Sequence, residues 1–165
     1  MRFPAAAAFL LLAAVPAPAA APAAQPGSAL ERFFIGATEG SGTVQVVLSG
    51  RHKVRDRSRG RMDAAGALLI DQVVEEEGKP PRRRSWRLVR AGGSKVGGTI
   101  SDAKGAVQGE LTGDALHLRY RLAEGPSVEQ WITLDPGGRS ARNRMVFHRF
   151  GMKVATVETV IRKVS

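Results

Sequence analysis

The feature that most constrains the fold is a series of short β-rich segments, each followed by residues that favour a turn. Valine, isoleucine, threonine and aromatic residues recur at alternate positions, which is typical of strands, and the intervening Gly, Pro and Asp favour turns. The predicted strands are Thr43–Ser49, Lys53–Met62, Ala67–Glu77, Arg83–Ala91, Lys95–Ser101, Ala106–Leu111, Ala115–Leu122, Ser127–Leu134, Ser140–Phe150 and Met152–Val164.

About ten strands joined by short turns indicate sequential antiparallel pairing. In a small domain such a sheet tends to close, because closure removes the exposed edge strands. We therefore predict an all-β fold, a single antiparallel up-and-down barrel of about ten strands. A short helical turn over Leu30–Ile35 precedes it.

Residues 1–23 have the order of charge, apolar core and small residues that is typical of a cleavable secretory signal peptide. The apolar core, Ala5 to Val15, is shorter than the ~20 residues of a membrane-spanning helix. Cleavage is expected after Ala19 or after Ala23, because each has an alanine two positions earlier.

The chain has no cysteine, so a lipid cannot be attached to a cysteine at the cleavage site. A domain without disulfides must also rely on its own packed core. We expect a linker over residues 24–29 and one β-barrel domain over residues 30–165. After signal cleavage the protein should be soluble, in the periplasm or secreted, with no transmembrane helix.

The formal net charge is +10, and most of the 25 basic residues are arginine. We do not expect nucleic acid as a partner, because a periplasmic location removes most such partners. An anionic membrane surface remains an open alternative. The basic face expected from strand alternation consists of Arg51, Lys53, Arg55, Arg57, Arg59 and Arg61.

This basic face has two interpretations. If the next strand pairs with it so that Arg57 lies opposite Asp71 and Lys53 opposite Glu75, the face is part of a charge-complementary exposed hairpin. Arg51 would then lie opposite Glu77. The alternative is a strip that binds anions.

The sequence contains no complete catalytic motif, so we expect no enzymatic activity and no cofactor. His52, His117 and His148 lie on different predicted strands, and we expect no metal site. Polar and aromatic residues on faces predicted to point inward are candidates for lining a ligand cavity or forming internal salt bridges. They are Arg84, Trp86, Tyr120, Glu129, Trp131 and Glu158.

Short motifs along residues 30–154 resemble a known family. They are Leu30-Glu31-Arg32-Phe33-Phe34-Ile35-Gly36, Arg82-Arg83-Arg84-Ser85-Trp86-Arg87, Gly97-Gly98-Thr99-Ile100-Ser101-Asp102 with Gly105 and Gly109, Glu129-Gln130-Trp131, Asn143-Arg144-Met145 and Phe150-Gly151-Met152-Lys153-Val154. Their order and spacing resemble the bacterial putative-lipoprotein family known as domain of unknown function 3833. The resemblance implies an envelope protein with a lipocalin-like (calycin-like) barrel, and it supplies no catalytic residues.

Two functions are favoured at this point, and a third, an enzyme acting on lipid or an isomerase-like barrel, stays open although no nucleophile–base pair is evident. In the first, the barrel binds a small apolar or lipid-like ligand in the cell envelope. In the second, Trp86, Trp131 and Tyr120 fill the interior, and the protein acts as an envelope interaction module through its basic face.

Overall fold

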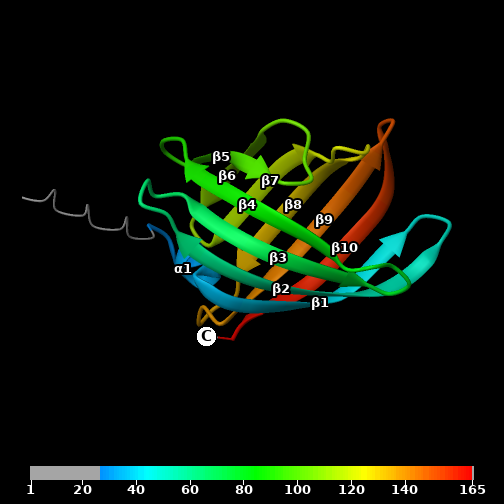
Figure 1. Ribbon diagram of the computed structural model, residues 1–165, viewed down its shortest axis with the longest axis horizontal. Coiled ribbons are helices and arrows are strands. Elements are labelled where there is room, and N and C mark those ends of the chain that lie inside the picture. The colour runs from blue at the N-terminus through cyan, green and yellow to red at the C-terminus, as the bar shows by residue number, and fades with distance from the viewer. Residues whose placement is uncertain (1–26, 165) are drawn as a thin grey trace, which may run out of the picture.

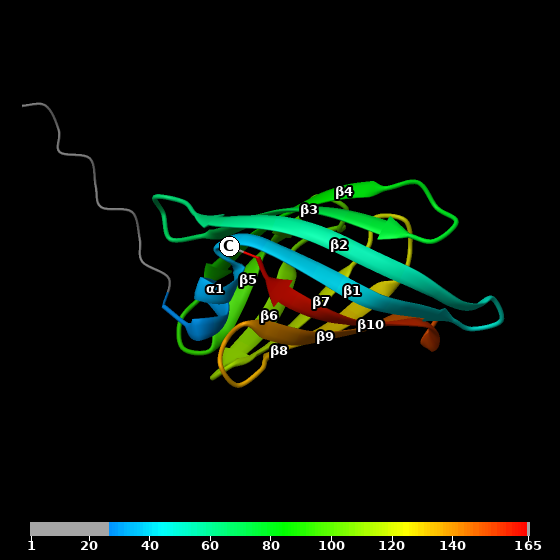
Figure 2. The ribbon, with the colours of Figure 1, turned by 90° about the horizontal axis from the view of Figure 1, so that it is seen from below.

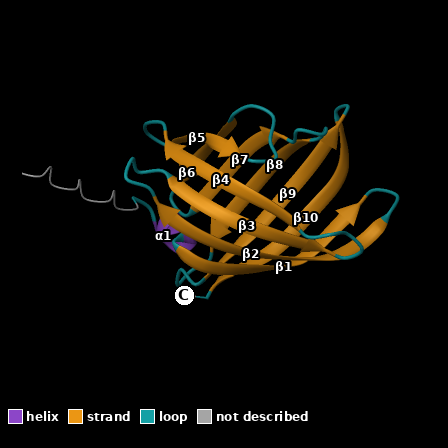
Figure 3. Cartoon of the chain, in the orientation of Figure 1, coloured by secondary structure: helices purple, strands orange, loops and turns teal. Residues whose placement is uncertain are grey.

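The computed structural model describes residues 27–164, which form one short helix and ten strands in a closed barrel (Figures 1 and 3). The predicted signal peptide and its cleavage sites lie outside the described residues. The elements are α1 (Ala29–Phe34), β1 (Gly36–Val46), β2 (Gly50–Met62), β3 (Leu68–Glu76), β4 (Arg82–Arg90), β5 (Lys95–Ile100), β6 (Val107–Thr112), β7 (Ala115–Arg121), β8 (Ser127–Leu134), β9 (Ser140–Arg149) and β10 (Met152–Lys163).

Each strand pairs antiparallel with the next one in the chain, and β1 closes the barrel by pairing with β10. The predicted fold class is therefore confirmed. The meander follows from the short turns, because a chain that reverses after a few residues places consecutive strands side by side. Among the described residues, no helix has the length and apolar character needed to span a membrane.

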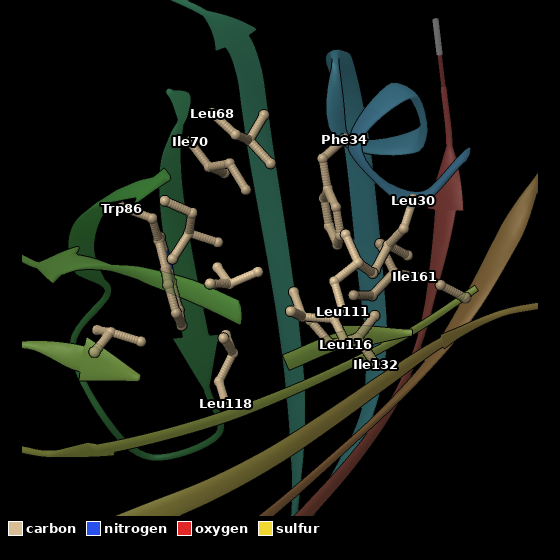
Figure 4. Close-up of a cluster of buried hydrophobic side chains, with 14 of the residues drawn as sticks. Leu30, Phe34, Leu68, Ile70, Trp86, Leu111, Leu116, Leu118, Ile132 and Ile161 are labelled. Carbon is tan, nitrogen blue, oxygen red and sulfur yellow. The ribbon is translucent and has the colours of Figure 1, made fainter. Parts of the chain in front are cut away.

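Helix α1 closes one end of the barrel (Figures 2 and 4). Ser28 caps it through a capping box, in which the Glu31 amide donates to Ser28 Oγ and the Ser28 amide donates to the Glu31 carboxylate. Leu30, Phe33 and Phe34 are buried. They belong to a core with residues from the adjacent strand ends, which include Leu68, Leu88, Leu111, Leu116, Leu134 and Ile161.

The first strand begins earlier than predicted. The glycine-rich segment before Thr43 is part of β1, which starts at Gly36 and ends at Val46. Gly40 and Gly42 lie where a side chain would collide with the neighbouring strands, so glycine there permits close pairing. Low β-propensity of glycine in the sequence thus concealed a strand whose backbone must approach its neighbours closely.

The predicted register of the β2–β3 hairpin was wrong by two residues, although the assignment of its faces was correct. Arg59 lies opposite Asp71 and Arg55 opposite Glu75. The turn decides this register. The Asp63 carboxylate accepts hydrogen bonds from the amides of Ala65 and Ala67, at 2.9 and 2.8 Å, and so holds a five-residue loop, residues 63–67.

Candidate ligand cavity

The interior of the barrel is filled by side chains at the α1 end and is hollow toward the opposite end. A cavity of about 290 Å³ lies inside, lined by residues of β1–β4 and β7–β10, with Phe34 of α1 among the lining residues. The strand ends opposite α1 surround it mostly with apolar side chains, which include Val44, Val54, Val74, Phe147 and Val157. We call these side chains the apolar collar. The charged residues Glu76, Lys79 and Arg82 also line the cavity. One or two inward-facing positions closer to α1 along the strands, the register places polar side chains between this collar and the core.

The first group of polar side chains connects β4, β3 and β2. Trp86 Nε1 donates to Gln72 Oε1 at 3.1 Å, and Gln72 Nε2 donates to Asp56 Oδ1 at 3.1 Å. Ser58 Oγ also lies 3.4 Å from Asp56 Oδ1. The indole nitrogen can only donate, so it sets the orientation of the Gln72 amide and directs the amide nitrogen to the carboxylate.

Burial raises the pKa of Asp56, because the carboxylate loses contact with water inside the barrel. Hydrogen bonds from Gln72 and Ser58 and the positive charge of Arg84 oppose this rise without cancelling it. Gly40 lies opposite Asp56 on β1, and a Cβ at Gly40 would collide with the carboxylate. The sequence therefore makes room for a buried acid at this point of the wall.

The second group crosses β7, β8, β9 and β10. Tyr120 Oη donates to Gln130 Oε1 at 3.2 Å, Gln130 Nε2 to Asn143 Oδ1 at 2.8 Å, and Asn143 Nδ2 to Thr159 Oγ1 at 3.0 Å. All four residues are buried. Burial raises the pKa of Tyr120 to about 12, so its hydroxyl stays protonated and acts as a donor at neutral pH.

Arg84 lies beside the first group, with 11 % of its side chain exposed. Its guanidinium binds both carboxylate oxygens of Asp102, with Nη2 2.7 Å from Oδ2 and 2.9 Å from Oδ1. It also lies 5.5 Å from the centre of the Trp86 ring. The charge of Arg84 is therefore paired, as a buried charge requires.

Together these side chains form a polar belt around the inside of the barrel. The belt consists of Asp56, Ser58, Gln72, Arg84, Trp86, Tyr120, Gln130, Asn143 and Thr159, and Gly40 and Gly42 of β1 lie between its two ends. Each amide nitrogen uses one hydrogen in the bonds described, so Gln72, Gln130 and Asn143 each keep a second N–H. The belt can therefore donate hydrogen bonds to a polar group placed in the cavity.

The structure brings together three of the six residues predicted to line a cavity. Arg84 and Trp86 line it, and Tyr120 is buried among them, 5.8 Å from the Trp86 ring by centroids. Trp86 and Tyr120 meet edge to face and occupy one side of the interior without filling it.

The inward orientation predicted for Glu129 and Trp131 was wrong. Strand β8 buries Val128, Gln130 and Ile132, so the alternate residues face outward. Trp131 stacks on His117 across the outer wall, with ring centres 4.9 Å apart and planes 8° apart. Glu129 accepts from His117 and Arg119 there. Stacking on His117 covers the indole on the outside, and strand alternation alone does not show such a contact.

The prediction for Glu158 was wrong for a different reason. A register irregularity between Lys153 and Ala155 shifts the alternation of β10, so that Val157, Thr159 and Ile161 face the interior. Glu158 is exposed, and its carboxylate lies 3.8 Å from Arg144 Nε. A bulge of this kind depends on the partner strand and leaves little trace in the sequence.

Six belt residues were not predicted as site residues: Asp56, Ser58, Gln72, Gln130, Asn143 and Thr159. A signal was present for two of them. Gln72 and Gln130 each stand between two apolar residues of the same face in alternating strands, which places a polar group among inward-facing side chains.

The basic face of β2 points outward as predicted, since all six of its residues are exposed.

Charge pairing on the basic face runs diagonally between β2 and β3. Arg57 Nη2 lies 2.7 Å from Glu75 Oε1, and Arg61 Nη1 lies 3.3 Å from Asp71 Oδ2. These exposed pairs contribute at most about 1 kcal/mol each. They reduce the free positive charge in the middle of β2. Within residues 27–164 no group of three or more acidic or histidine side chains is placed to hold a metal ion.

Comparison with known proteins agrees with this architecture. The family described as "Protein of unknown function (DUF3833)" matches residues 8–163, and the chain belongs to this family. No curated protein matches the sequence. Among solved structures, the S-type phycobiliprotein lyase CPES from Guillardia theta is similar, with a TM-score of 0.63 and 10 % identity over 82 % of this chain and 91 % of that chain. This likeness shows the fold alone, a lipocalin-like barrel.

Proposed function

We propose that this member of the DUF3833 family is a binding protein that holds a small amphipathic molecule inside its barrel. The observation that carries the proposal is a hollow interior in which an apolar collar surrounds the entrance and a belt of hydrogen-bonding groups lies deeper. Ligand pockets commonly combine mostly apolar walls with a few placed polar groups, at volumes of ~300–1,000 Å³. The cavity of about 290 Å³ lies just below the lower limit of that range.

The belt indicates the chemistry of the polar group. The free N–H groups of Gln72, Gln130 and Asn143 favour an acceptor, such as a carbonyl, ester or carboxyl oxygen. The charged side chains that line the cavity do not add a strong preference. Asp102 pairs Arg84, and burial disfavours ionisation of Asp56. Lys79 and Arg82 pair with Glu76. The ligand would lie with its polar end at the belt and its apolar part in the collar.

Fold likeness supports this proposal and limits it. A barrel resembling that of a phycobiliprotein lyase is compatible with holding a small ligand. We propose no lyase activity, because the likeness extends to the fold alone. The alternative of a filled barrel required Trp86, Trp131 and Tyr120 to fill the interior. It is not supported, because Trp131 lies on the outer wall and the interior is hollow.

The location proposed for this activity is the cell envelope. Its support is the composition of residues 1–23, which has the pattern of a secretory signal. N-terminal sequencing of the protein recovered from its own host should find the new end after Ala19 or Ala23. Recovery in the cytosol with residues 1–23 intact would contradict the proposed location.

Ligand binding can be tested in two ways. Native mass spectrometry and lipid extraction of protein purified from its own host should find a bound amphipathic molecule. Titration with a dansyl-labelled medium-chain fatty acid and with anilinonaphthalene sulfonate should show saturable fluorescence. Absence of both a co-purified molecule and probe binding would refute the proposal.

A matched pair of variants separates the cavity from the outer wall. Val54→Phe adds volume inside the collar, whereas Val160→Phe makes the same change at a position that does not line the cavity. We expect Val54→Phe to weaken probe binding about tenfold or more, because it removes volume from a small pocket. Val160→Phe should bind as the wild type does. Equal effects of the two changes would place the probe outside the barrel.

A further inference from the structure

Two hairpin turns at the open end of the barrel carry large apolar side chains that point into solvent. Leu48, between β1 and β2, is fully exposed, and Phe150, between β9 and β10, is 89 % exposed. Val47 and Met152 beside them are also exposed. Among the described residues only Val164, near the C-terminus, is a further large apolar residue of this kind. We call Val47, Leu48, Phe150 and Met152 the apolar edge.

The two turns belong to neighbouring hairpins. Strand β1 pairs with β10, and the Val47 amide donates to the Val154 carbonyl oxygen at 2.9 Å. Both turns lie at the end of the barrel away from α1 (Figures 1 and 2). Residues of these hairpins, Val44, Val46 and Ala155, also line the cavity. The apolar edge is therefore part of the rim of the cavity entrance.

The backbone at this edge is unfavourable for the residues it carries. Within residues 27–164 the non-glycine residues with a positive φ are Leu48, at 73°, and Phe150, at 51°. Glycine, asparagine and aspartate occupy this region at low cost, whereas other side chains meet the backbone. A turn suited to stability and solubility would carry Gly or Asn at both positions. Two strained residues with exposed apolar side chains indicate a role that folding does not explain.

Positive charge surrounds the same edge. Arg51 and Lys53 follow the first turn, and Arg149 and Lys153 flank the second. None of these four side chains forms a salt bridge within the described part of the chain, whereas Arg57 and Arg61 farther along β2 are paired. Unpaired cations around exposed apolar side chains complement a layer of anionic head groups over an apolar interior.

We propose that the apolar edge docks the open end of the barrel onto an anionic lipid surface. Leu48 and Phe150 enter the boundary between head groups and acyl chains, and the four cations contact lipid phosphates. A second copy of the chain fits less well, because two such edges would bring like charges together. The proposal goes beyond ligand binding and does not depend on it, although docking in this orientation would turn the cavity entrance toward the membrane.

The test compares two sets of variants of the full chain. Leu48→Asn with Phe150→Asn removes the two strained apolar side chains, and Val164→Asn removes an exposed apolar side chain outside the edge. Every variant keeps the N-terminal segment, so a difference in binding reports the edge. Binding is measured by co-sedimentation with vesicles of phosphatidylcholine alone and of phosphatidylcholine mixed with phosphatidylglycerol.

We expect the double variant to bind the anionic vesicles about tenfold or more weakly than the wild type, because two apolar side chains no longer leave water. Val164→Asn should bind as the wild type does. Wild-type binding should be weaker on phosphatidylcholine alone and should fall with added salt. The melting temperature of the double variant should be unchanged or higher, because asparagine suits a positive φ. A loss of binding would then not reflect unfolding.

Three results would overturn the proposal. The first is equal vesicle binding by the wild type and the double variant. The second is equal wild-type binding to neutral and anionic vesicles. In the third, sedimentation velocity shows a wild-type oligomer that the double variant lacks, which would make the edge an interface between copies. Two controls keep this test separate from the test of the cavity. The double variant should still bind the fluorescent fatty acid, and Val54→Phe should still bind the anionic vesicles.

Discussion

The two ends of this barrel are built from the same ten strands and differ in how they use them. At the closed end, α1 inserts Leu30, Phe33 and Phe34 among leucine and isoleucine side chains, and the interior is packed. At the open end the inward residues are mostly valines, with polar side chains below them, and the interior is hollow. One barrel of this size therefore has a packed core at one end and a cavity at the other.

The difference shows where stability and binding reside. Large apolar side chains that leave water on folding stabilise the closed end. In the open half, a buried carboxyl group and strained turns oppose stability locally, and the exposed apolar residues add none. Features that cost stability and persist are commonly functional, so we expect variants at the two ends to have different consequences.

The largest effect is expected from Leu30→Ala in α1. Leu30 is 1 % exposed, and its truncation leaves a cavity in the packed end, which should lower the free energy of unfolding by about 3 kcal/mol. Val44→Ala, at the wall of the hollow end, should lower it by roughly 1 kcal/mol, because fewer contacts are lost. Urea denaturation measures both values. Equal losses would show that the two ends do not differ in packing.

A smaller effect is expected from alanine at the two glycines of β1. At Gly42 an added Cβ would collide with the backbone of Glu158 and Thr159, so Gly42→Ala should cost about 2 kcal/mol. At Gly40 it would meet only the Asp56 side chain, which can move. Gly40→Ala should therefore cost less and should change the environment of Asp56. Thermal unfolding compares the two, and a larger loss for Gly40→Ala would contradict this account of the wall.

The smallest effect is expected from Asp56→Asn, and it depends on pH. Because burial raises the pKa of Asp56, the native state holds the proton more tightly than the unfolded state does. Stability from this group is therefore present at low pH and is lost as pH rises through the raised pKa. Asp56→Asn should raise the melting temperature at neutral pH, and the gain should shrink toward about pH 4. A gain that is constant over this range would refute a raised pKa.

Much of the fold could be predicted from the sequence because strands and turns are local. The predicted segment Ser127–Leu134 matches β8 in both bounds, and most other segments match within one or two residues. The first strand was placed late, because its glycines are explained only by tertiary neighbours: the β10 backbone lies close to Gly42, and the Asp56 side chain lies close to Gly40. The polar belt could be predicted only in part, because faces were assigned by side-chain type, which misplaced Glu129 and Trp131.

By itself, the sequence determined the number and order of the strands, their closure into one barrel, the apolar helix at its start and the exposed basic face of β2. Each of these follows from residues near one another in the chain, through strand periodicity and turn preference. Only the tertiary structure decided that Asp56, Gln72, Gln130 and Asn143 face one cavity, and that Leu48 and Phe150 share one rim. These relations depend on register, on the bulge in β10 and on closure between β1 and β10, which bring together residues far apart in the sequence.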